Sequence, residues 1–252
     1  MIILDRFEKW IENNFDLSNP KILAKYDHTH SVYEIATQIV ETEQFSNEDK
    51  FIAQTIAILH DCGRFIQIRD FDTFKDSKDF DHAVEGANLL ENGLLEQILP
   101  ETREYDCIII PAVRYHNRLA LPECDERQLM HCELIRDADR TDLYNVCLNH
   151  FDVTFWFNDN TSNLTPAVKQ LFENRKPISF SVLQNQLDLL ALRFSLLYQY
   201  KYVSALLYFK NNNYISRITE LFSTKLPFYN QDDLNWIKLA SEKVLDEYLN
   251  AH

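Results

Sequence analysis

Apolar residues recur at helical spacing through almost the whole chain, and this pattern limits the possible folds more than any other feature. One such stripe consists of Val32, Ile35, Ala36, Ile39 and Val40. Similar patterns predict helices over residues 81–99, 104–118, 126–150, 165–174, 180–210 and 231–250. The segment FDVTFWF, at residues 151–157, is the one stretch with the character of a short strand. The predicted fold class is therefore all-α, with the helices packed as a bundle.

The size of the chain allows one compact unit. Its 252 residues are 46% hydrophobic, which is enough apolar material to bury a sizeable core. No linker rich in Pro, Gly or Ser divides the sequence. We expect an N-terminal helical domain over residues 1–150 and a helical C-terminal extension over residues 151–252 that packs on it, so that the two form one structural unit.

Charge and composition exclude several classes of partner. The net charge of -14 gives no basic surface for a nucleic-acid backbone or an anionic membrane. With only three glycines, the chain cannot form the glycine-rich phosphate loops of P-loop and dinucleotide-binding proteins. The five cysteines lack a C-x-x-C pair, and no signal peptide or membrane span is evident, so we expect reduced thiols and a cytoplasmic location. An acidic chain can still bind a phosphorylated small molecule if cations supply local positive charge.

A helix is predicted to begin at Ser46, with Asp49 in the pattern of a capping box, and Gly63 can end it. His60 and Asp61 would then lie on its last turn, where adjacent side chains have the freedom to converge on a metal ion. The residues that follow, 64–80, are polar and aromatic without helical spacing. We expect them to form a loop at the rim of an active site.

Six residues stand in an order that suits metal binding: His30, His60, Asp61, His82, His116 and Asp139. Imidazole nitrogens and carboxylate oxygens together suit Mn, Fe, Co, Ni or Zn, with Mg also possible, and helices in a bundle can direct them to a common centre. Asp61 has two carboxylate oxygens and could bridge two ions, so one or two divalent ions are expected.

The neighbours of these residues have expected roles of their own. Arg64 would lie at the mouth of the site and pair with a phosphate oxygen. Asp81 and Asp137 would orient imidazoles or a water, although Asp81 suits a helix N-cap equally well. The remaining histidines are expected on the surface or in the core; they are His28, His131, His150 and His252.

The contexts HSVYEIA around His30, ILHDCGRF around the His-Asp doublet and RDADRTD around Asp139 resemble the HD superfamily of metal-dependent phosphohydrolases. The contexts DHAVEG and VRYHN, around the other two histidines, resemble the subset with a second metal site, which includes the HD-GYP phosphodiesterases. That subset often has histidine where this chain has Asn117. The likeness covers residues 26 to about 145, and residues 183–217 are similar to the C-terminal helices of bacterial stand-alone HD proteins.

The resemblance implies an HD-domain bundle that hydrolyses a phosphorylated small molecule, a nucleotide phosphomonoester, by a metal-activated water, with Asp61 and Arg64 as catalytic residues. Three alternatives stay open. They are a phosphodiesterase, a non-catalytic nucleotide-binding regulator, and a di-iron oxygenase like the inositol oxygenases, which use the same order of four histidines and two aspartates. The sequence predicts no oligomeric state.

Overall fold

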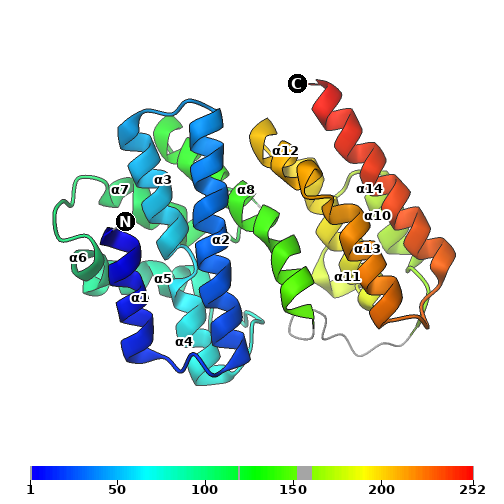
Figure 1. Ribbon diagram of the computed structural model, residues 1–252, viewed down its shortest axis with the longest axis horizontal. Coiled ribbons are helices and arrows are strands. Elements are labelled where there is room, and N and C mark those ends of the chain that lie inside the picture. Colours follow the sequence, from blue (N-terminus) through cyan, green and yellow to red (C-terminus); the bar gives the residue numbers. More distant parts are fainter. Residues whose placement is uncertain (1, 119, 152–160, 252) are drawn as a thin grey trace. The chain divides into compact units, whose positions relative to one another are not determined.

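The computed structural model describes residues 2–118, 120–151 and 161–251. Within these ranges every regular element is a helix and no β-strand occurs, which confirms the all-α fold class. Residues 152–157 of the segment FDVTFWF lie outside the described residues. The chain divides into two compact units, Met1–Asp142 and Leu143–His252 (Figure 1). That the C-terminal extension packs on the N-terminal domain stays a prediction.

The first unit is a bundle of helices. It consists of α1 (Ile2–Asn14), α2 (Pro20–Thr42), α3 (Asn47–Leu59), α4 (Cys62–Phe71), α5 (His82–Leu89), α6 (Leu95–Ile98), α7 (Asp106–Tyr115) and most of α8 (Glu126–Asn149). Helices α2 and α3 lie side by side (Figure 1), and α5 packs against both α4 and α7. The apolar stripe of α2 from Val32 to Val40 is completely buried and forms the centre of this core.

Local sequence signals set the starts of the helices that carry the site. Helix α2 begins with Pro20, whose missing N–H is no loss at that position, and the side chain of Asn19 accepts from the amide of Lys21. The hydroxyl of Ser46 caps α3 by accepting from the amide of Asp49 at 3.1 Å, as predicted. Asp81 caps α5 by accepting from the amides of two following residues.

The helix that Ser46 caps ends earlier than predicted. Helix α3 ends at Leu59 and α4 begins at Cys62, so His60 and Asp61 form the junction between two helices. Gly63 lies inside α4, where a Cβ atom would meet the carbonyl oxygen of His82 at 2.1 Å and the amide nitrogen of Gly86 at 2.6 Å. Glycine is needed here because α4 and α5 touch backbone to backbone, and it does not end a helix.

The prediction of a loop over residues 64–80 is wrong for its first half, because α4 continues to Phe71. Phe65 and Ile68 lie three residues apart and are at most 1% exposed, so together they form the buried face of this helix. The connection to α5 is therefore shorter than predicted, and it begins with Asp72 in the left-handed conformation at the C-terminus of α4.

The second unit is also helical. It contains the end of α8, α10 (Pro166–Glu173), α11 (Gln186–Ser195), α12 (Val203–Asn211), α13 (Tyr214–Lys225) and α14 (Gln231–Ala251). The single helix predicted over residues 180–210 is two helices, because Asn185 caps α11 and Tyr200 is extended. Helix α13 was not predicted; Asn213, in the left-handed conformation, separates it from α12. Tyr144 of α8 stacks on Phe194 in this core, with ring centroids 5.6 Å apart.

Candidate metal centre

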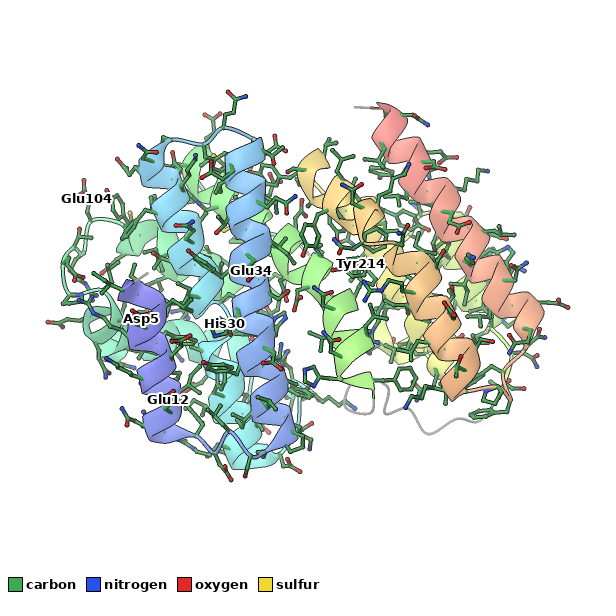
Figure 2. The ribbon with its side chains drawn as sticks, viewed as in Figure 1. Asp5, Glu12, His30, Glu34, Glu104 and Tyr214 are labelled. Atoms are coloured by element: carbon green, nitrogen blue, oxygen red, sulfur yellow. The ribbon has the colours of Figure 1, made fainter. Side chains whose placement is uncertain are left out.

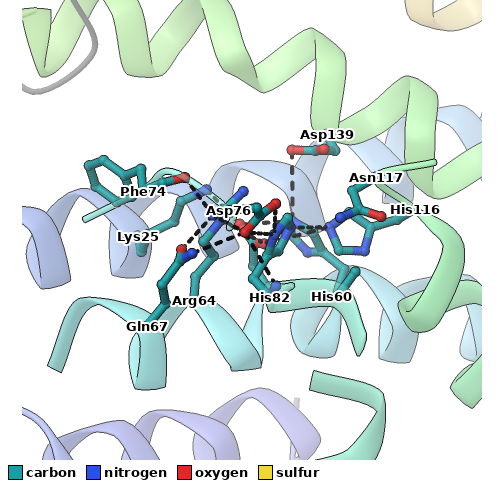
Figure 3. A network of polar contacts seen from close by, with 12 residues as sticks. Lys25, His60, Arg64, Gln67, Phe74, Asp76, His82, His116, Asn117 and Asp139 are labelled. Carbon is teal, nitrogen blue, oxygen red and sulfur yellow. Dashed lines mark hydrogen bonds and ion pairs between the residues drawn. The ribbon is translucent and has the colours of Figure 1, made fainter. Parts of the chain in front are cut away.

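Polar side chains from five parts of the first unit meet in one cluster, which we call the His-Asp centre. Its members are His28 of α2, His60 and Asp61 of the α3–α4 junction, His82 at the start of α5, His116 directly after α7, and Asp139 of α8. Figure 3 labels His60, His82, His116 and Asp139. The four histidines are at most 5% exposed. Helix ends and one helix face therefore converge on a buried point.

The histidines form two pairs. In the first pair, the Nε2 atoms of His28 and His60 are 3.2 Å apart. In the second pair, the Nε2 atoms of His82 and His116 are 3.1 Å apart. Nε2 is a common metal ligand. In each pair, the two Nε2 atoms lie closer together than twice the length of a metal–nitrogen bond.

Asp61 lies between the two pairs. Its Oδ2 atom is 3.5 Å from Nε2 of His28 and 3.6 Å from Nε2 of His60. Its Oδ1 atom is 3.5 Å from Nε2 of His82 and 3.6 Å from Nε2 of His116. The carboxylate makes no capping hydrogen bond to α4, although Asp61 precedes that helix. One oxygen of a single carboxylate therefore faces each histidine pair.

Backbone carbonyls orient one histidine of each pair. Nδ1 of His60 is 2.8 Å from the carbonyl oxygen of Ala57, and Nδ1 of His116 is 2.7 Å from that of Val113. A carbonyl oxygen only accepts, so the proton of each neutral imidazole is on Nδ1. Both rings therefore present the lone pair of Nε2 to the centre, as metal-bound histidines do.

Carboxylates orient the other two histidines. Nδ1 of His28 is 2.6 Å from Oδ2 of Asp142, and Nδ1 of His82 is 2.8 Å from Oδ2 of Asp76. Neither aspartate was singled out from the sequence for this role, which had been expected of Asp81 and Asp137. Asp81 caps α5 and accepts from the side-chain amide of Asn117 at 3.0 Å. A carboxylate on the far nitrogen makes an imidazole a stronger ligand.

Asp139 lies beside the first histidine pair. Its Oδ1 atom is 3.1 Å from Nε2 of His28 and 3.8 Å from Nε2 of His60. Its side chain is 31% exposed, in contrast to the buried histidines. Asp139 therefore lies on the side of the His-Asp centre that solvent reaches.

The structure corrects the prediction for His30, because it brings His28 and not His30 into the His-Asp centre. Nε2 of His30 is 3.1 Å from Oε1 of Glu8, and Figure 2 shows His30 on the side of α2 that faces α1. Helical spacing contained the signal: His28 precedes Val32 by four residues and Ile35 by seven, so it continues the buried stripe. His28 had been assigned a surface or core role.

Arg64 lies beside the His-Asp centre but is already engaged. Its Nη1 atom donates to Oε1 of Gln67 at 2.5 Å, to the carbonyl oxygen of Phe74 at 2.6 Å and to Oδ1 of Asp76 at 3.0 Å. Its Nε atom is 3.9 Å from Oδ1 of Asp61. Arg64 thus holds the loop after α4 against His82, and contact with a phosphate stays a prediction.

Lys25 also lies beside the His-Asp centre, and it was not predicted from the sequence. It lies on α2 one turn before His28, and its Nζ atom donates to Oδ2 of Asp61 at 2.5 Å (Figure 3). Lys25 lies close to the buried stripe of α2 that includes His28, but most lysines are exposed to solvent.

Burial and charge set the protonation of the centre. Burial lowers the pKa of His60 to about 4 against the attraction of nearby carboxylates, and burial together with the charge of Arg64 lowers the pKa of His82 to about 4. Burial and Lys25 oppose protonation of His28, but its three aspartate neighbours raise its pKa to about 10. Burial would raise the pKa of Asp61, yet Lys25 and His60 hold it well below the usual range.

The residues present fit divalent metal ions. Among the described residues, three groups of side chains each have ligand atoms within 4.8 Å of one another, and two of these groups share Asp61. One consists of His28, His60 and Asp61, and the other of Asp61, His82 and His116. The rings of His60 and His116 point lone pairs inward, and His28 carries a proton that a cation can replace. Nitrogen and carboxylate donors of this kind suit transition metals.

The family comparison agrees with the geometry. The sequence model of the HD domain family matches residues 26–144, a range that includes every member of the His-Asp centre. The searches of curated proteins and of solved structures gave no match. In the described part of the chain, no helix combines the length and the apolar character needed to cross a membrane. Residues 26–144 therefore match the HD domain family, which the His-Asp motifs of this segment resemble.

Proposed function

We propose that the chain is a metal-dependent phosphohydrolase whose substrate is a phosphorylated small molecule, a nucleotide phosphomonoester. HD domains are in general metal-dependent hydrolases. The observation that carries the proposal is the position of Asp61, with one carboxylate oxygen toward each histidine pair. This arrangement supports a centre of two ions. The nucleotide rests on the resemblance to HD phosphohydrolases.

Divalent ions in this centre would acidify a water near neutral pH and stabilise the negative charge on the phosphoryl oxygens. The chain's own residues hold the arrangement in place. Asp142 and Asp76 fix the rings of His28 and His82, so that little reorganisation accompanies the reaction. We propose that Arg64, whose Nε atom is 3.9 Å from Oδ1 of Asp61, pairs with a phosphoryl oxygen.

We also infer a cytoplasmic location. The structure contains no disulfide among its five cysteines, all of which lie in the described ranges. Unlinked cysteines of this number are typical of a reducing compartment.

A di-iron oxygenase is a second candidate, favoured by the donor set itself. With His28 in place, the order along the chain is four histidines and two aspartates, which the HD-type inositol oxygenases share. Iron content with a mixed-valence signal and the consumption of dioxygen would favour this candidate over hydrolysis.

The proposal is tested on protein purified without chelator. We expect two metal ions per chain by elemental analysis, and release of phosphate from a panel of nucleotides with added Mn, Mg, Co or Ni. Asp61→Asn should lower both metal content and turnover, the latter by at least about 100-fold, because both histidine pairs lose their shared carboxylate.

Asp70→Asn is the matched control, because Asp70 is exposed and pairs with Arg69. It removes the same charge and should leave metal content and turnover unchanged. Protein that binds no metal on titration, or an Asp61→Asn variant that releases phosphate at the wild-type rate, would contradict the proposed function.

A further inference from the structure

The ammonium group of Lys25 lies on the carboxylate oxygen that the first histidine pair needs. Its Nζ atom is 2.5 Å from Oδ2 of Asp61, and the same oxygen is 3.5 Å from Nε2 of His28. An ammonium and a divalent ion repel each other, so metal at the first pair weakens the contact between Lys25 and this oxygen. Metal at the first pair therefore favours a position of Lys25 away from Asp61.

Lys25 is able to move, whereas the Nη1 group of Arg64 is held. Nη1 of Arg64 donates to three oxygen acceptors, two of them in the loop after α4. The contact of Lys25 within the His-Asp centre is to Asp61, and its side chain ends in a flexible four-carbon stem. Lys25 is 17% exposed and Asp139 is 31% exposed, so both lie where solvent reaches the His-Asp centre. A displaced ammonium would stay at this open side.

An anionic substrate needs a positive charge, such as the ammonium of Lys25, close to where it binds. The chain has a net charge of -14, so a phosphorylated molecule is repelled at long range and must be held by local cations. A lysine ammonium is a compact charge that suits a phosphoryl oxygen. Its place beside Asp61 puts it next to the point where the proposed reaction would occur.

We propose that Lys25 exchanges partners: its ammonium lies on Asp61 while the first histidine pair is without metal, and on a phosphoryl oxygen of the substrate once metal has bound. This inference rests on the proposed function, and it adds a phosphate-binding residue that the HD motifs do not include. It requires two effects of opposite direction when Lys25 is removed. The metal ion no longer competes with an ammonium group for Asp61, and the phosphate loses a cation that it would bind.

The test measures binding and not turnover. The full-length chain is stripped of metal and titrated with Mn²⁺, and the Mn²⁺-loaded protein is then titrated with inorganic phosphate, both by calorimetry. For Lys25→Met we expect Mn²⁺ to bind at least as tightly as in the wild type and phosphate to bind about tenfold more weakly. Lys25→Gln should give the same pair of results, and Lys25→Arg should recover most of the phosphate binding.

Lys21→Met is the control, because Lys21 lies one turn earlier on α2 and pairs with Asp72, outside the centre. It should match the wild type in both titrations. If Mn²⁺ does not bind the wild type, the proposed function and the role of Lys25 both fail. If Mn²⁺ binds but phosphate binds Lys25→Met as it binds the wild type, or binds neither, the role of Lys25 alone is refuted.

Discussion

His28 and His30 lie two residues apart on α2, but their side chains have different surroundings. His28 is 3% exposed and contacts His60, Asp61, Asp139 and Asp142. His30 is 33% exposed and pairs with Glu8 of α1. Two residues correspond to a rotation of about 200° around a helix axis. One histidine therefore faces the core of the bundle while the other does not.

This difference predicts opposite results for a matched pair of variants. His28→Asn should reduce bound metal from two ions to one, because the first pair loses a ligand that Asp142 orients. His30→Asn should keep two ions and full turnover. Elemental analysis of both proteins decides between the two positions. Loss of metal in His30→Asn with retention in His28→Asn would reverse the assignment.

His131 is a buried histidine outside the centre. It is completely buried, its Nε2 atom is 3.1 Å from Oδ1 of Asp49, and its Nδ1 atom has no hydrogen-bond partner in the described part of the chain. Burial lowers the pKa of His131 despite the attraction of Asp49. Protonation would place an N–H group in the core without an acceptor, so the folded state prefers the neutral ring.

This lowered pKa makes stability depend on pH in a defined direction. The unfolded chain takes up the proton near pH 6.5 and the folded chain only at lower pH, so the contribution is complete above pH 6.5 and is lost as the pH falls below it. We expect the free energy of unfolding, measured by urea denaturation with chelator present, to decrease from pH 6.5 to 5, a range in which the raised pKa of His28 adds no further change. His131→Gln should decrease less. Part of the slope should remain, because the pKa values of His60 and His82 are also lowered.

Equal slopes for the wild type and His131→Gln would mean that His131 takes up its proton at the same pH in the folded and unfolded chains. Changing the buffer ions at each pH is the control for specific anion binding.

At the scale of elements, the contact between α4 and α5 sets the position of Asp61 relative to His82. Gly63 follows Asp61 by two residues, and it lies against Gly86 and the carbonyl oxygen of His82. The absence of two side chains lets the backbones touch, which places Oδ1 of Asp61 3.5 Å from Nε2 of His82. The glycines therefore determine a distance in the site without being part of it.

Gly63→Ala should disturb this alignment. The new Cβ would lie 2.1 Å from a carbonyl oxygen that belongs to a packed backbone, so α4 and α5 must separate. We expect a loss of about 1–3 kcal/mol in the free energy of unfolding, and of the metal ion at the second pair, because overpacked cores shift their backbone. Urea denaturation and elemental analysis measure the two effects.

Gly93→Ala serves as the comparison. Gly93 has a φ of 111°, and no atom lies within 4 Å of a Cβ at this position. The variant should be destabilised by about 1 kcal/mol or more through backbone strain alone, with both metal ions retained. A Gly63→Ala protein with two ions and wild-type stability would show that the close approach is not required.

At the scale of the whole molecule, the described members of the centre all belong to the first compact unit, Met1–Asp142. The second unit has its own core, in which Tyr144 packs between Phe194 and Phe209. The long α8 contributes Asp139 to the first unit and Tyr144 to the second. The metal chemistry proposed here therefore depends on residues of one unit, and the net charge of -14 acts on any anionic substrate from the chain as a whole.

The sequence by itself determined the fold class and the identity of most of the centre. Helical spacing predicted the all-α class, and the predicted starts of α3, α8, α10 and α14 lie within one residue of those observed. The motif order identified His60, Asp61, His82, His116 and Asp139 as members of one cluster. These features are local, or they reflect the order of residues along the chain, so they can be read without coordinates.

Tertiary structure decided which atoms meet. Lys25 and Asp61 are 36 residues apart, and His28 and Asp142 are 114 apart, so no spacing rule links them. Gly63 resembled a helix end because glycine is common there, but it lies against Gly86, which belongs to another helix. The choice of His28 over His30 depends on which face of α2 the bundle buries. Packing between helices sets these contacts, since it depends on the shapes of surfaces that are distant in sequence.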